Sequence, residues 1–545
     1  MSIKISNSTI SDIIVKIFKK HNISNICISP GSRNIPLIKA FTLYKFFNNY
    51  SHIDERSAAF FALGASKAAN TPAVVITTSG TAVANLLPAV IESDLSKTPL
   101  IIISADRPKN LINTGENQTI NQNGIFDNFI RKKIQLESPV NSFELIIKKI
   151  DAVVNAAKGD NDNKASGPVH INIAFDEPLL DKNINNNYKI TIFKSNKSTK
   201  PKKINLPDFK KPLIICGQSR IYNFDKIVKL STQLNAPILA DTISQTRLWK
   251  KHNNIICHYD FYIDQLNIKP DLIIRFGKKP TSKKLNHLLK KYKNKTWLIS
   301  DDYGYNDDAP NTAHHKDLIL NYNSDKSWLK YLKEIDNQTA LLLRKNSKTI
   351  FFEGNIIFSL IDNLSKNDTL IVGNSLTVRN LEKYCHNVNK KIKVFSNRGA
   401  SGIDGIISTA MGIASSKNSN SRNILILGDV SFFYDISALL LNQNKINLTV
   451  IVINNKGGQI FTTINYDSKI EKFKRFMTTP VNMKIKDLCK ASKINYYNIK
   501  SINMINSKLN TIIDKKGIQI IEILCDIKTT VNIERKINRK IKLII

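Results

Sequence analysis

The sequence is poor in the features that mark secreted, metal-clustered and membrane-spanning proteins. It has 6 cysteines in 545 residues, with no CxxC motif, which argues against a zinc site and a disulfide-stabilised secreted scaffold. The one adjacent histidine pair, His314–His315, lies among polar residues and forms no metal motif. No stretch approaches the roughly 18 consecutive apolar residues of a membrane span. Charged residues interrupt the apolar ones between positions 1 and 22, which predicts an amphipathic helix and no signal peptide. We therefore expect a soluble, cytoplasmic protein.

Acidic residues are also scarce. The chain has 80 Lys and Arg against 44 Asp and Glu, a net charge of +36. Such an excess raises the possibility of nucleic-acid binding, because basic side chains bind phosphates. The lysines, however, are spread along the whole chain and form no single stripe interleaved with aromatic residues. We expect no nucleic-acid partner and no membrane span, and the positive field favours small anionic substrates.

The apolar content is high enough for several buried cores. Hydrophobic residues make up 42% of the chain, which excludes a disordered protein and suits three or four domains at roughly 100–200 residues each. Apolar runs at 73–77 and 99–104 flank a helix expected over 82–95, a βαβ unit that predicts a parallel sheet. Further strands are expected at 213–216, 237–240, 272–275, 297–300, 370–373, 424–427 and 448–453. The pattern predicts an α/β fold with three doubly wound domains and mainly parallel sheets.

Polar stretches suggest where these domains meet. We predict a first α/β domain at 1–183, a linker at 184–211 rich in Asn, Lys and Ser, a central α/β domain at 212–348 and a third α/β domain at 349–545. Residues 200–203 are expected to be part of the linker. The basic end, from Arg535 to Ile545, carries no motif and is expected to be a tail or an edge element.

The sharpest local motif begins at Gly428–Asp429 and ends at Asn454–Asn455. The residues between them suffice for one helix and one strand, so both ends return to the carboxyl edge of the sheet, where open α/β folds bind ligands. A carboxylate and an amide oxygen together suit Mg²⁺. The turn that follows, Lys456-Gly457-Gly458, has a backbone that could serve a metal or a diphosphate. The alternative is an ordinary helix start capped by Asp429. The residues alone do not decide between a metal site and a helix cap.

This spacing resembles the signature of the thiamine diphosphate-dependent enzymes. The resemblance implies a thiamine diphosphate-binding fold in which Asp429, Asn455 and the Gly457 carbonyl hold Mg²⁺ (or Mn²⁺) on the cofactor, next to Gly428. It also implies a second domain that binds the pyrimidine ring and supplies a glutamate. Glu55, at the start of an apolar helix, fits that role as a proton donor to a ring nitrogen. The alternative is a simple electrostatic preference for an acid at a helix N-terminus.

Further strings narrow the resemblance. They are Ser29–Leu37, Asp54–Ser57, Thr78–Asn85, Ala105–Pro108, Asn117–Ile120, Gly167–His170, Gly373–Ser375 with Arg379, Asn397–Gly405 and Gly457–Phe461. In combination they are similar to the 2-succinyl-5-enolpyruvyl-6-hydroxy-3-cyclohexene-1-carboxylate synthase family. The match covers both outer domains, whereas the central domain matches mainly through Gly277 and Thr281–Lys284.

The resemblance implies a transferase of menaquinone or phylloquinone biosynthesis. Such an enzyme decarboxylates 2-oxoglutarate and adds the succinyl-carbanion equivalent to isochorismate in a conjugate addition. Both substrates are dicarboxylates, which arginine binds in a planar, two-pronged way that lysine cannot reproduce. Arg33, Arg107, Arg379 and Arg398 stand inside the motifs of this lysine-rich chain. The alternative for any one of them is a surface ion pair.

Individual roles are likewise implied by the resemblance. The catalytic set would be Glu55, Arg33, Gln118, Ser375 and Arg379. Ile403 would support the bent cofactor, with Ser375 nearby. Substrate contacts would come from Ser32, Arg33, Arg107, Asn117, Gln118, Lys283, Arg379, Arg398, Ile460 and Phe461. One departure is Lys284, where related enzymes often have arginine, so this position would bind carboxylate less rigidly.

The resemblance further implies that two subunits complete each site, because Glu55 and the residues Asp429 and Asn455 lie on different domains. A homodimer is the minimum and a homotetramer is expected. One alternative is another thiamine diphosphate-dependent 2-keto acid carboligase or decarboxylase. A second alternative is a non-catalytic binding protein on the same fold, which would be expected to have lost Glu55 or Asp429.

Overall fold

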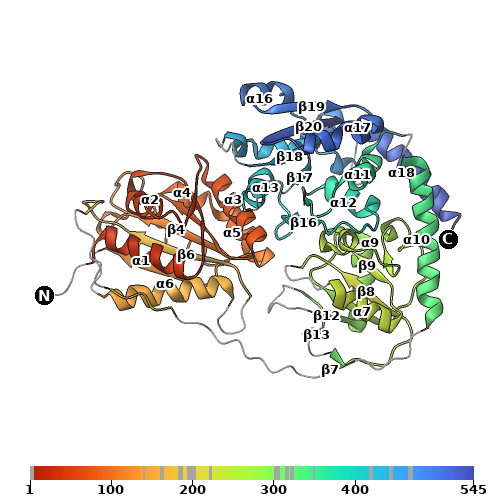
Figure 1. Cartoon of the computed structure of the whole chain (residues 1–545), viewed down its shortest axis with the longest axis horizontal. Coiled ribbons are helices and arrows are strands. Elements are labelled where there is room, and N and C mark those ends of the chain that lie inside the picture. The colour runs from red at the N-terminus through yellow and green to blue at the C-terminus, as the bar shows by residue number, and fades with distance from the viewer. Residues whose placement is uncertain are drawn as a thin grey trace. The chain divides into compact units, whose positions relative to one another are not determined.

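The computed structural model describes residues 5–138, 142–159, 165–181, 188–192, 204–219, 224–299, 307–313, 318–319, 325–347, 350–416, 422–440, 446–463 and 470–545 (Figure 1). Several predictions lie outside the described residues. These are His314–His315, linker residues 184–187 and 193–203, the domain boundaries at 183, 184 and 348, the strand end at Ser300 and the first four residues of the N-terminal helix. All six cysteines are described, and none of them forms a disulfide.

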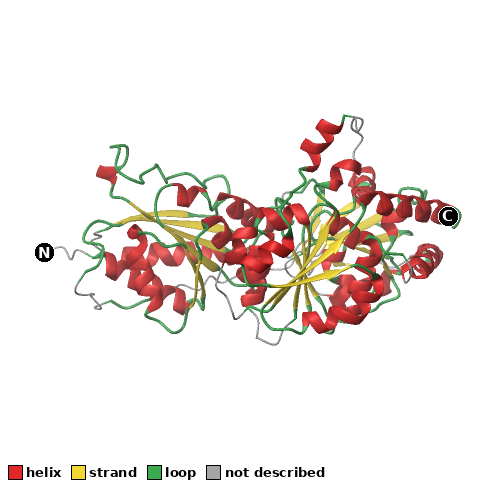
Figure 2. Cartoon of the chain, turned by 90° about the horizontal axis from the view of Figure 1, so that it is seen from above, coloured by secondary structure: helices red, strands yellow, loops and turns green. Residues whose placement is uncertain are grey.

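The described chain contains three six-stranded sheets, and every strand pair in them is parallel, for example β3 with β4 and β17 with β18. Helices flank the strands (Figure 2). The predicted fold class is therefore confirmed. The chain forms two compact units, the first comprising 1–198, 397–419 and 434–446, and the second comprising 199–396, 420–433 and 447–545.

The first unit contains the first sheet, in the strand order β2-β1-β3-β4-β6-β5. Its strands are β1 (Asn25–Ile28), β2 (Asn48–Ser51), β3 (Ala73–Thr77), β4 (Leu100–Asp106), β5 (Lys133–Glu137) and β6 (Pro168–Ala174). Its helices are α1 (Asn7–Lys20), α2 (Ile35–Thr42), α3 (Glu55–Ala69), α4 (Thr81–Ala84), α5 (Leu87–Ser96), α6 (Phe143–Lys158) and α13 (Ile406–Ser415). Strands β3 and β4 are buried along their whole length, because helices cover both faces of a parallel sheet.

The helix expected over 82–95 is wrong as a single element. It is divided into α4 and α5, and Pro88 lies in the first turn of α5. Proline fits there because the first-turn N–H groups have no partner within the helix. The break leaves Asn85 and Leu86 between the two helices, where Asn85 reaches a candidate site residue, as shown below.

Two glycines let α3 and α13 pack closely. A Cβ on Gly64 would lie 2.0 Å from the Thr409 carbonyl oxygen, and one on Gly412 would lie 2.0 Å from the Phe61 carbonyl oxygen. Side chains at either position would force the backbones apart. The close contact fixes the start of α13 against the helix that begins at Glu55.

The second unit contains the other two sheets, in the orders β10-β9-β8-β11-β12-β13 and β16-β15-β17-β18-β20-β19. The second sheet has β8 (Pro212–Cys216), β9 (Ile238–Ala240), β10 (Ile255–Ile256), β11 (Leu272–Phe276), β12 (Thr296–Ile299) and β13 (Asn311–Ala313). The third sheet has β15 (Thr369–Val372), β16 (Lys393–Ser396), β17 (Asn423–Gly428), β18 (Leu448–Asn454), β19 (Asn495–Ile499) and β20 (Ile518–Leu524). A separate pair joins β7 (Ile204–Asn205) to β14 (Leu318–Ile319).

The helices of this unit surround both sheets. They are α7 (Phe224–Leu234), α8 (Thr246–Trp249), α9 (Lys283–Lys291), α10 (Lys326–Ser347), α11 (Glu353–Asn363), α12 (Leu376–Tyr384), α14 (Asp429–Tyr434), α15 (Glu471–Thr478), α16 (Ile485–Ala491), α17 (Ile502–Ile513) and α18 (Ile527–Lys542). The prediction of a tail or edge element at the basic end is wrong, because most of it is α18. Ile537 and Ile541 bury the inner side of that helix in the core.

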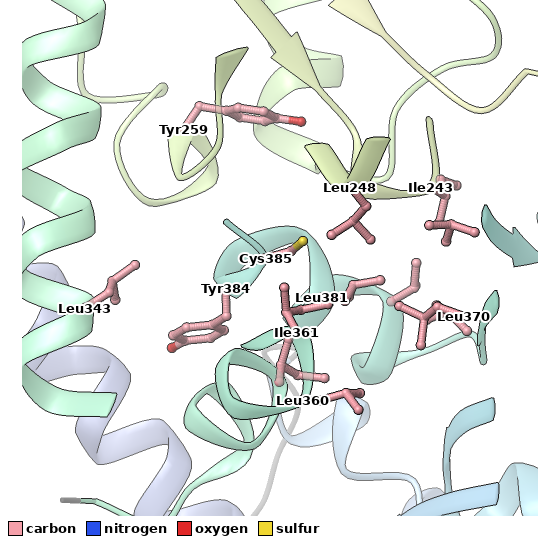
Figure 3. Close-up of a cluster of buried hydrophobic side chains, with 14 of the residues drawn as sticks. Ile243, Leu248, Tyr259, Leu343, Leu360, Ile361, Leu370, Leu381, Tyr384 and Cys385 are labelled. Atoms are coloured by element: carbon pink, nitrogen blue, oxygen red, sulfur yellow. The ribbon is translucent and has the colours of Figure 1, made fainter. Parts of the chain in front are cut away.

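One apolar cluster joins the second and third sheets within this unit. Leu248 and Ile243 of the central part lie near Leu370 and Leu381 of the third part (Figure 3). Burial of apolar side chains of this size contributes about 1.5–3 kcal/mol each. The two sheets therefore form one packed body.

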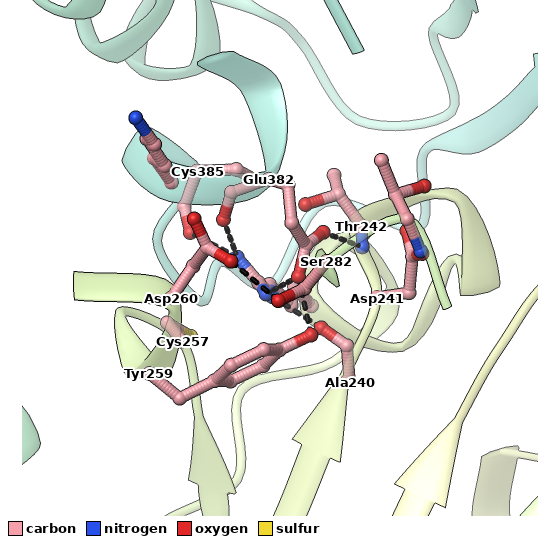
Figure 4. A network of polar contacts seen from close by, with 12 residues as sticks. Ala240, Asp241, Thr242, Cys257, Tyr259, Asp260, Ser282, Glu382 and Cys385 are labelled. Atoms are coloured by element: carbon pink, nitrogen blue, oxygen red, sulfur yellow. Dashed lines mark hydrogen bonds and ion pairs between the residues drawn. The ribbon is translucent and has the colours of Figure 1, made fainter. Parts of the chain in front are cut away.

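A buried ion pair reinforces this junction. Arg247 donates to Glu382 of α12 at 2.5 Å, and both side chains are almost fully excluded from solvent. Glu382 also accepts hydrogen bonds from the Thr242 amide, at 2.7 Å, and from the Tyr259 hydroxyl (Figure 4). Because its partners come from the central part of the chain, Glu382 fixes α12, the helix on which the candidate residue Arg379 lies.

Candidate active site

In the first unit, candidate residues gather where the strands of the first sheet end. Gly31 follows β1, and a Cβ there would lie 2.5 Å from the Cβ of Thr78, which follows β3. Only glycine allows this contact between the two loops. Ser32 and Arg33 come directly after Gly31, and Arg107 follows β4. The carboxyl edge of the sheet thus brings Ser32, Arg33 and Arg107 into one region, as parallel strands predict.

The two arginines of this region are largely buried. Arg33 donates to the Phe175 carbonyl at 3.1 Å and lies 3.5 Å from the Glu177 carboxylate. Its Nε is buried and has no hydrogen-bond partner among the described residues. Burial lowers the pKa of Arg107, and the positive charge of Arg33 lowers it further. Two neighbouring guanidinium groups with incomplete charge compensation favour an anionic ligand.

A buried network of polar side chains holds the backbone of Arg107 in place. The Asp106 carboxylate accepts from the Arg107 amide at 2.8 Å and from Asn172 at 2.7 Å. Asn172 in turn accepts from Gln122 at 2.8 Å, and Gln122 accepts from the Gly80 amide at 2.9 Å. Burial raises the pKa of Asp106. Sequence reasoning missed Asn172 and Gln122, because no local pattern links them to the motifs.

Gln118 is held over the loop that follows β3. It has a positive φ of 58°, and its side chain donates to the Ser79 carbonyl at 3.0 Å. The Ser79 hydroxyl donates to the Gln118 carbonyl at 3.1 Å and also contacts the Arg107 guanidinium. Gln118 therefore lies with Arg107 around one serine, and both Gln118 and the neighbouring Asn117 are exposed.

Glu55 is the first residue of α3 and is half-buried. The N-cap is Asp54, whose carboxylate accepts from the Ser57 amide at 3.2 Å. Glu55 is thus relieved of the capping role, and its Oε2 accepts a long hydrogen bond of 3.4 Å from Asn85. The carboxylate of Glu55 is therefore not used as the helix cap, although its place in the first turn still suits the helix dipole.

The neighbours of Glu55 are tied to residues far away in the chain. Ser57 shares a hydrogen bond of 2.8 Å with Ser408, and Ser408 donates through its amide and hydroxyl to Asp435 at 2.7 and 3.0 Å. Arg56 donates to the Tyr434 carbonyl at 3.1 Å. Burial raises the pKa of Asp435 to about 7. Because Arg56 and Ser57 directly follow Glu55, these contacts fix the position of Glu55.

Arg398 and Ile403 lie in segment 397–405, which precedes α13 and belongs to the first unit. The Glu92 carboxylate accepts from the Gly399 amide at 3.0 Å and from the Ala400 amide at 2.7 Å. Lys67 donates to Glu92 at 3.2 Å and to Asn397 at 2.7 Å. A cavity of about 250 Å³ borders this segment. Glu92 and Lys67, which the sequence reasoning also missed, hold the segment that carries both candidates.

In the second unit, three neighbouring strands of the third sheet end in candidate residues. Ser375 follows β15, Asp429 follows β17 and Asn455 follows β18. Asp429 accepts a hydrogen bond from the Gly457 amide at 2.7 Å, so the two ends of the motif meet as predicted. Gly457 has a φ of +116°, and a Cβ there would lie 2.4 Å from the Thr478 carbonyl oxygen. Only glycine fits this turn.

This group has the donor chemistry of a magnesium site. Burial raises the pKa of Asp429 to about 6, as expected for a carboxylate far from a compensating cation. The set consists of a carboxylate, an amide and a backbone carbonyl, which are hard oxygen ligands of the kind Mg²⁺ takes alongside phosphate oxygens. No cluster of three or more His, Cys, Asp or Glu residues suited to a metal is found among the described residues. The single carboxylate suits an ion that also binds a diphosphate.

Ser375 and Arg379 lie beside this set. Ser375 caps α12 with a φ of 66°, and Arg379 donates to the Ser375 carbonyl at 2.6 Å. Ile460 and Phe461 follow the glycine turn and are half-buried. Gly428 ends β17, where a Cβ would meet nothing within 4 Å.

Lys283 stands apart from these residues in the second sheet's part of the chain. It is the exposed first residue of α9. Its neighbour Lys284 forms an ion pair with Asp264 at 2.8 Å. Lys284 is therefore engaged in an ion pair with this carboxylate. No helix among the described residues has both the length and the apolar character needed to cross a membrane.

Three family models, all of thiamine pyrophosphate enzyme domains, match successive parts of the chain. The model described as "Thiamine pyrophosphate enzyme, N-terminal TPP binding domain" matches residues 8–125. "Middle domain of thiamine pyrophosphate" matches 182–372. "Thiamine pyrophosphate enzyme, C-terminal TPP binding domain" matches 379–523. The Glu55 region falls in the first match, and the Asp429 and Asn455 region falls in the third.

Curated relatives extend the similarity to nearly full length. The chain is 35% identical over 483 residues to a 2-succinyl-5-enolpyruvyl-6-hydroxy-3-cyclohexene-1-carboxylate synthase of Staphylococcus haemolyticus, covering 85% of each chain. It is 30% identical over 550 residues to the protein of that name from Bacillus cytotoxicus, covering 95% of this chain and 93% of the relative. The crystal structure of benzoylformate decarboxylase from Polynucleobacter necessarius matches with a TM-score of 0.69 and 15% identity, over 95% of this chain and 98% of that one. At that identity the structural match shows the fold alone.

Proposed function

The chain belongs to the 2-succinyl-5-enolpyruvyl-6-hydroxy-3-cyclohexene-1-carboxylate synthase family of thiamine pyrophosphate enzymes, and from this we propose the activity of that name for it. The proposed reaction is the decarboxylation of 2-oxoglutarate and the conjugate addition of the remaining succinyl unit to isochorismate, in menaquinone or phylloquinone biosynthesis. The observation that carries the proposal is the contact between Asp429 and the Gly457 amide. It joins the two ends of the cofactor motif at the carboxyl edge of the third sheet.

The residues of the two units suit the two ends of the cofactor. When bound, thiamine diphosphate supplies a nucleophilic carbon and an electron sink for decarboxylation. Asp429, Asn455 and the Gly457 carbonyl would hold Mg²⁺ or Mn²⁺ against the diphosphate, and Gly428 leaves room for it. Glu55 would exchange a proton with the pyrimidine ring, and Ile403 would support the ring system.

Substrate binding requires fixed positive charge for carboxylates. Arg33 and Arg107 provide two neighbouring guanidinium groups in the first unit, supported by Gln118 and by Ser32 and Asn117 nearby. Arg379, with Ser375, Ile460 and Phe461, would serve the second unit, and Arg398 and Lys283 would add further positive charge. The number of arginines favours dicarboxylate substrates over the monocarboxylic keto acids of other carboligases.

We propose a homodimer as the smallest active assembly and a homotetramer as the full one. The two groups of site residues belong to different units of the chain, and the motifs resemble a family in which two subunits complete each site. We also propose that the enzyme works in the cytoplasm, with no nucleic-acid partner. We further propose that the domain boundaries lie at 183, 211 and 348.

A product assay with substituted substrates tests the proposed function. The purified protein is incubated with thiamine diphosphate, Mg²⁺, isochorismate and either 2-oxoglutarate or pyruvate, and the products are identified by mass spectrometry. We expect the succinyl adduct with 2-oxoglutarate and little adduct with pyruvate. An acyl product from pyruvate alone would assign the chain to a different carboligase. No product and no bound cofactor would favour a non-catalytic protein on this fold.

A further inference from the structure

A buried glutamate that no motif contains touches the proposed metal site. Glu353 opens α11 and is 3% exposed. Its Oε1 accepts a hydrogen bond of 2.8 Å from the side-chain amide of Asn455. Its Oε2 accepts one of 2.6 Å from the side-chain amide of Asn380. Each carboxylate oxygen therefore holds one asparagine.

The chemistry of this contact fixes the orientation of Asn455. A carboxylate only accepts hydrogen bonds, and an asparagine amide donates only through its nitrogen. The nitrogen of Asn455 must therefore face Glu353, and its oxygen must point away. The reverse orientation would set two acceptor oxygens against each other in a buried place and leave the hydrogen bond unmade. A metal ligand needs the oxygen, so this is the orientation that Mg²⁺ binding requires.

Glu353 itself is held firmly. A Cβ on Gly354, the next residue, would lie 2.4 Å from the ring of Tyr384 at the end of α12, so the start of α11 lies directly against that ring. The Asn355 side chain donates to the Ile350 carbonyl at 2.6 Å. The carboxylate therefore sits on a backbone with little freedom to shift.

We propose that Glu353 is a positioning residue that turns the Asn455 oxygen toward the metal ion and, through Asn380, ties this ligand to α12. Asn380 follows Arg379 on that helix, so one carboxylate links the metal end of the site to a substrate-binding side chain. The inference rests on the proposed cofactor site. Outer partners of this kind orient metal ligands, and their loss typically weakens metal binding about 10–100-fold.

The chain provides a matched control in the neighbouring residue. Asn454 donates its side-chain amide to Glu522 at 2.6 Å, and Glu522 is 8% exposed. The negative charge of Glu522 also raises the pKa of Asp429. Glu522→Gln therefore removes a buried carboxylate close to the same site without touching Asn455. Any effect of bulk negative charge on the metal appears in both variants, whereas an effect of orientation appears only in Glu353→Gln.

Mn²⁺ binding tests the proposal on the full-length protein. The free Mn²⁺ signal is followed by electron paramagnetic resonance with saturating thiamine diphosphate, for the wild type, Glu353→Gln and Glu522→Gln. We expect Glu353→Gln to weaken Mn²⁺ binding about 10–100-fold and Glu522→Gln to weaken it several times less. Turnover of Glu353→Gln should recover at high Mn²⁺, since the ligand is misoriented and not lost. Thermal unfolding of both variants checks that each is folded.

Two results would overturn the positioning role. One is wild-type Mn²⁺ affinity in folded Glu353→Gln, and the other is an equal loss in the two variants. If Glu353→Gln fails to fold, Asn380→Leu takes its place in the comparison. This variant removes the hydrogen bond from Asn380 to Glu353, and unchanged Mn²⁺ affinity in it would contradict the link to α12. Failure of the wild type itself to bind Mn²⁺ with the cofactor would contradict the proposed function instead, so the two failures are distinguishable.

Discussion

The Glu92 side chain gives a prediction whose size follows from its contacts. It is 3% exposed and its partner Lys67 is 8% exposed. Glu92→Leu keeps a similar volume but leaves the amides of Gly399 and Ala400 without their acceptor and the Lys67 ammonium without its counter-charge. Removing one partner of a buried ion pair costs about 3–5 kcal/mol. We expect that loss in the local stability of segment 397–405.

Lys67→Met is the matched comparison. It removes the cation but leaves Glu92 with both backbone donors, at 3.0 and 2.7 Å. Lys67→Met should therefore destabilise the segment by about 1–3 kcal/mol less than Glu92→Leu does, because it leaves no buried backbone donor unsatisfied. The double variant should be less destabilised than the sum of the two single variants, because each single change leaves the other charge unpaired.

Hydrogen exchange of the peptide covering 397–405 measures this directly, since a chain of two units does not unfold as a single two-state system. At a factor of ten per 1.4 kcal/mol, Glu92→Leu should speed exchange by about 100- to 4,000-fold. Lys67→Met should speed it less. Wild-type exchange in Glu92→Leu, or a larger effect from Lys67→Met, would refute the reasoning.

Three further predictions concern the carboxylates of the site. Glu55→Gln should leave folding intact and lower turnover by about 10²–10⁴-fold, the usual contribution of a positioned acid or base, and near-normal turnover would remove Glu55 from the catalytic set. Asp429→Ala should weaken the binding of Mg²⁺ and thiamine diphosphate together, and unchanged cofactor affinity in titration calorimetry would exclude a metal-ligand role. Burial raises the pKa of Asp435 from 3.8 to about 7, so the folded state retains this proton while the unfolded state loses it, and the wild type loses stability as pH rises between those values. Asp435→Asn has no such proton, so its stability relative to the wild type should increase from pH 5 to pH 8, and a constant difference in thermal unfolding would contradict the assignment.

The strands were predictable because parallel sheets bury both faces. The run at 73–77 is β3 residue for residue, since a strand covered on both sides must be apolar throughout. Helix ends were harder to predict. Pro88 divides the expected helix into α4 and α5, and α18 looked like a basic tail because only isolated apolar residues, such as Ile537 and Ile541, face the core.

The residues of the candidate site likewise divide into those that the sequence predicts and those that it does not. Asp429 and Asn455 directly follow strands, so their position at the sheet edge follows from the order of elements alone. Glu92, Glu353 and Asp435 could not be found this way. Glu353 contacts Asn455 across 102 residues, and Glu92 contacts Gly399 across 307. A buried carboxylate leaves no local pattern when its partners are so distant in sequence, and only the packed structure shows what each one holds.

The most direct test of the proposed function is carbon dioxide release from 2-oxoglutarate by the purified protein, with thiamine diphosphate and Mg²⁺, in the presence and absence of isochorismate. We predict release that isochorismate strongly stimulates, with isochorismate consumed in step. Release without stimulation, or no release although the cofactor is bound, would contradict the proposed transferase activity.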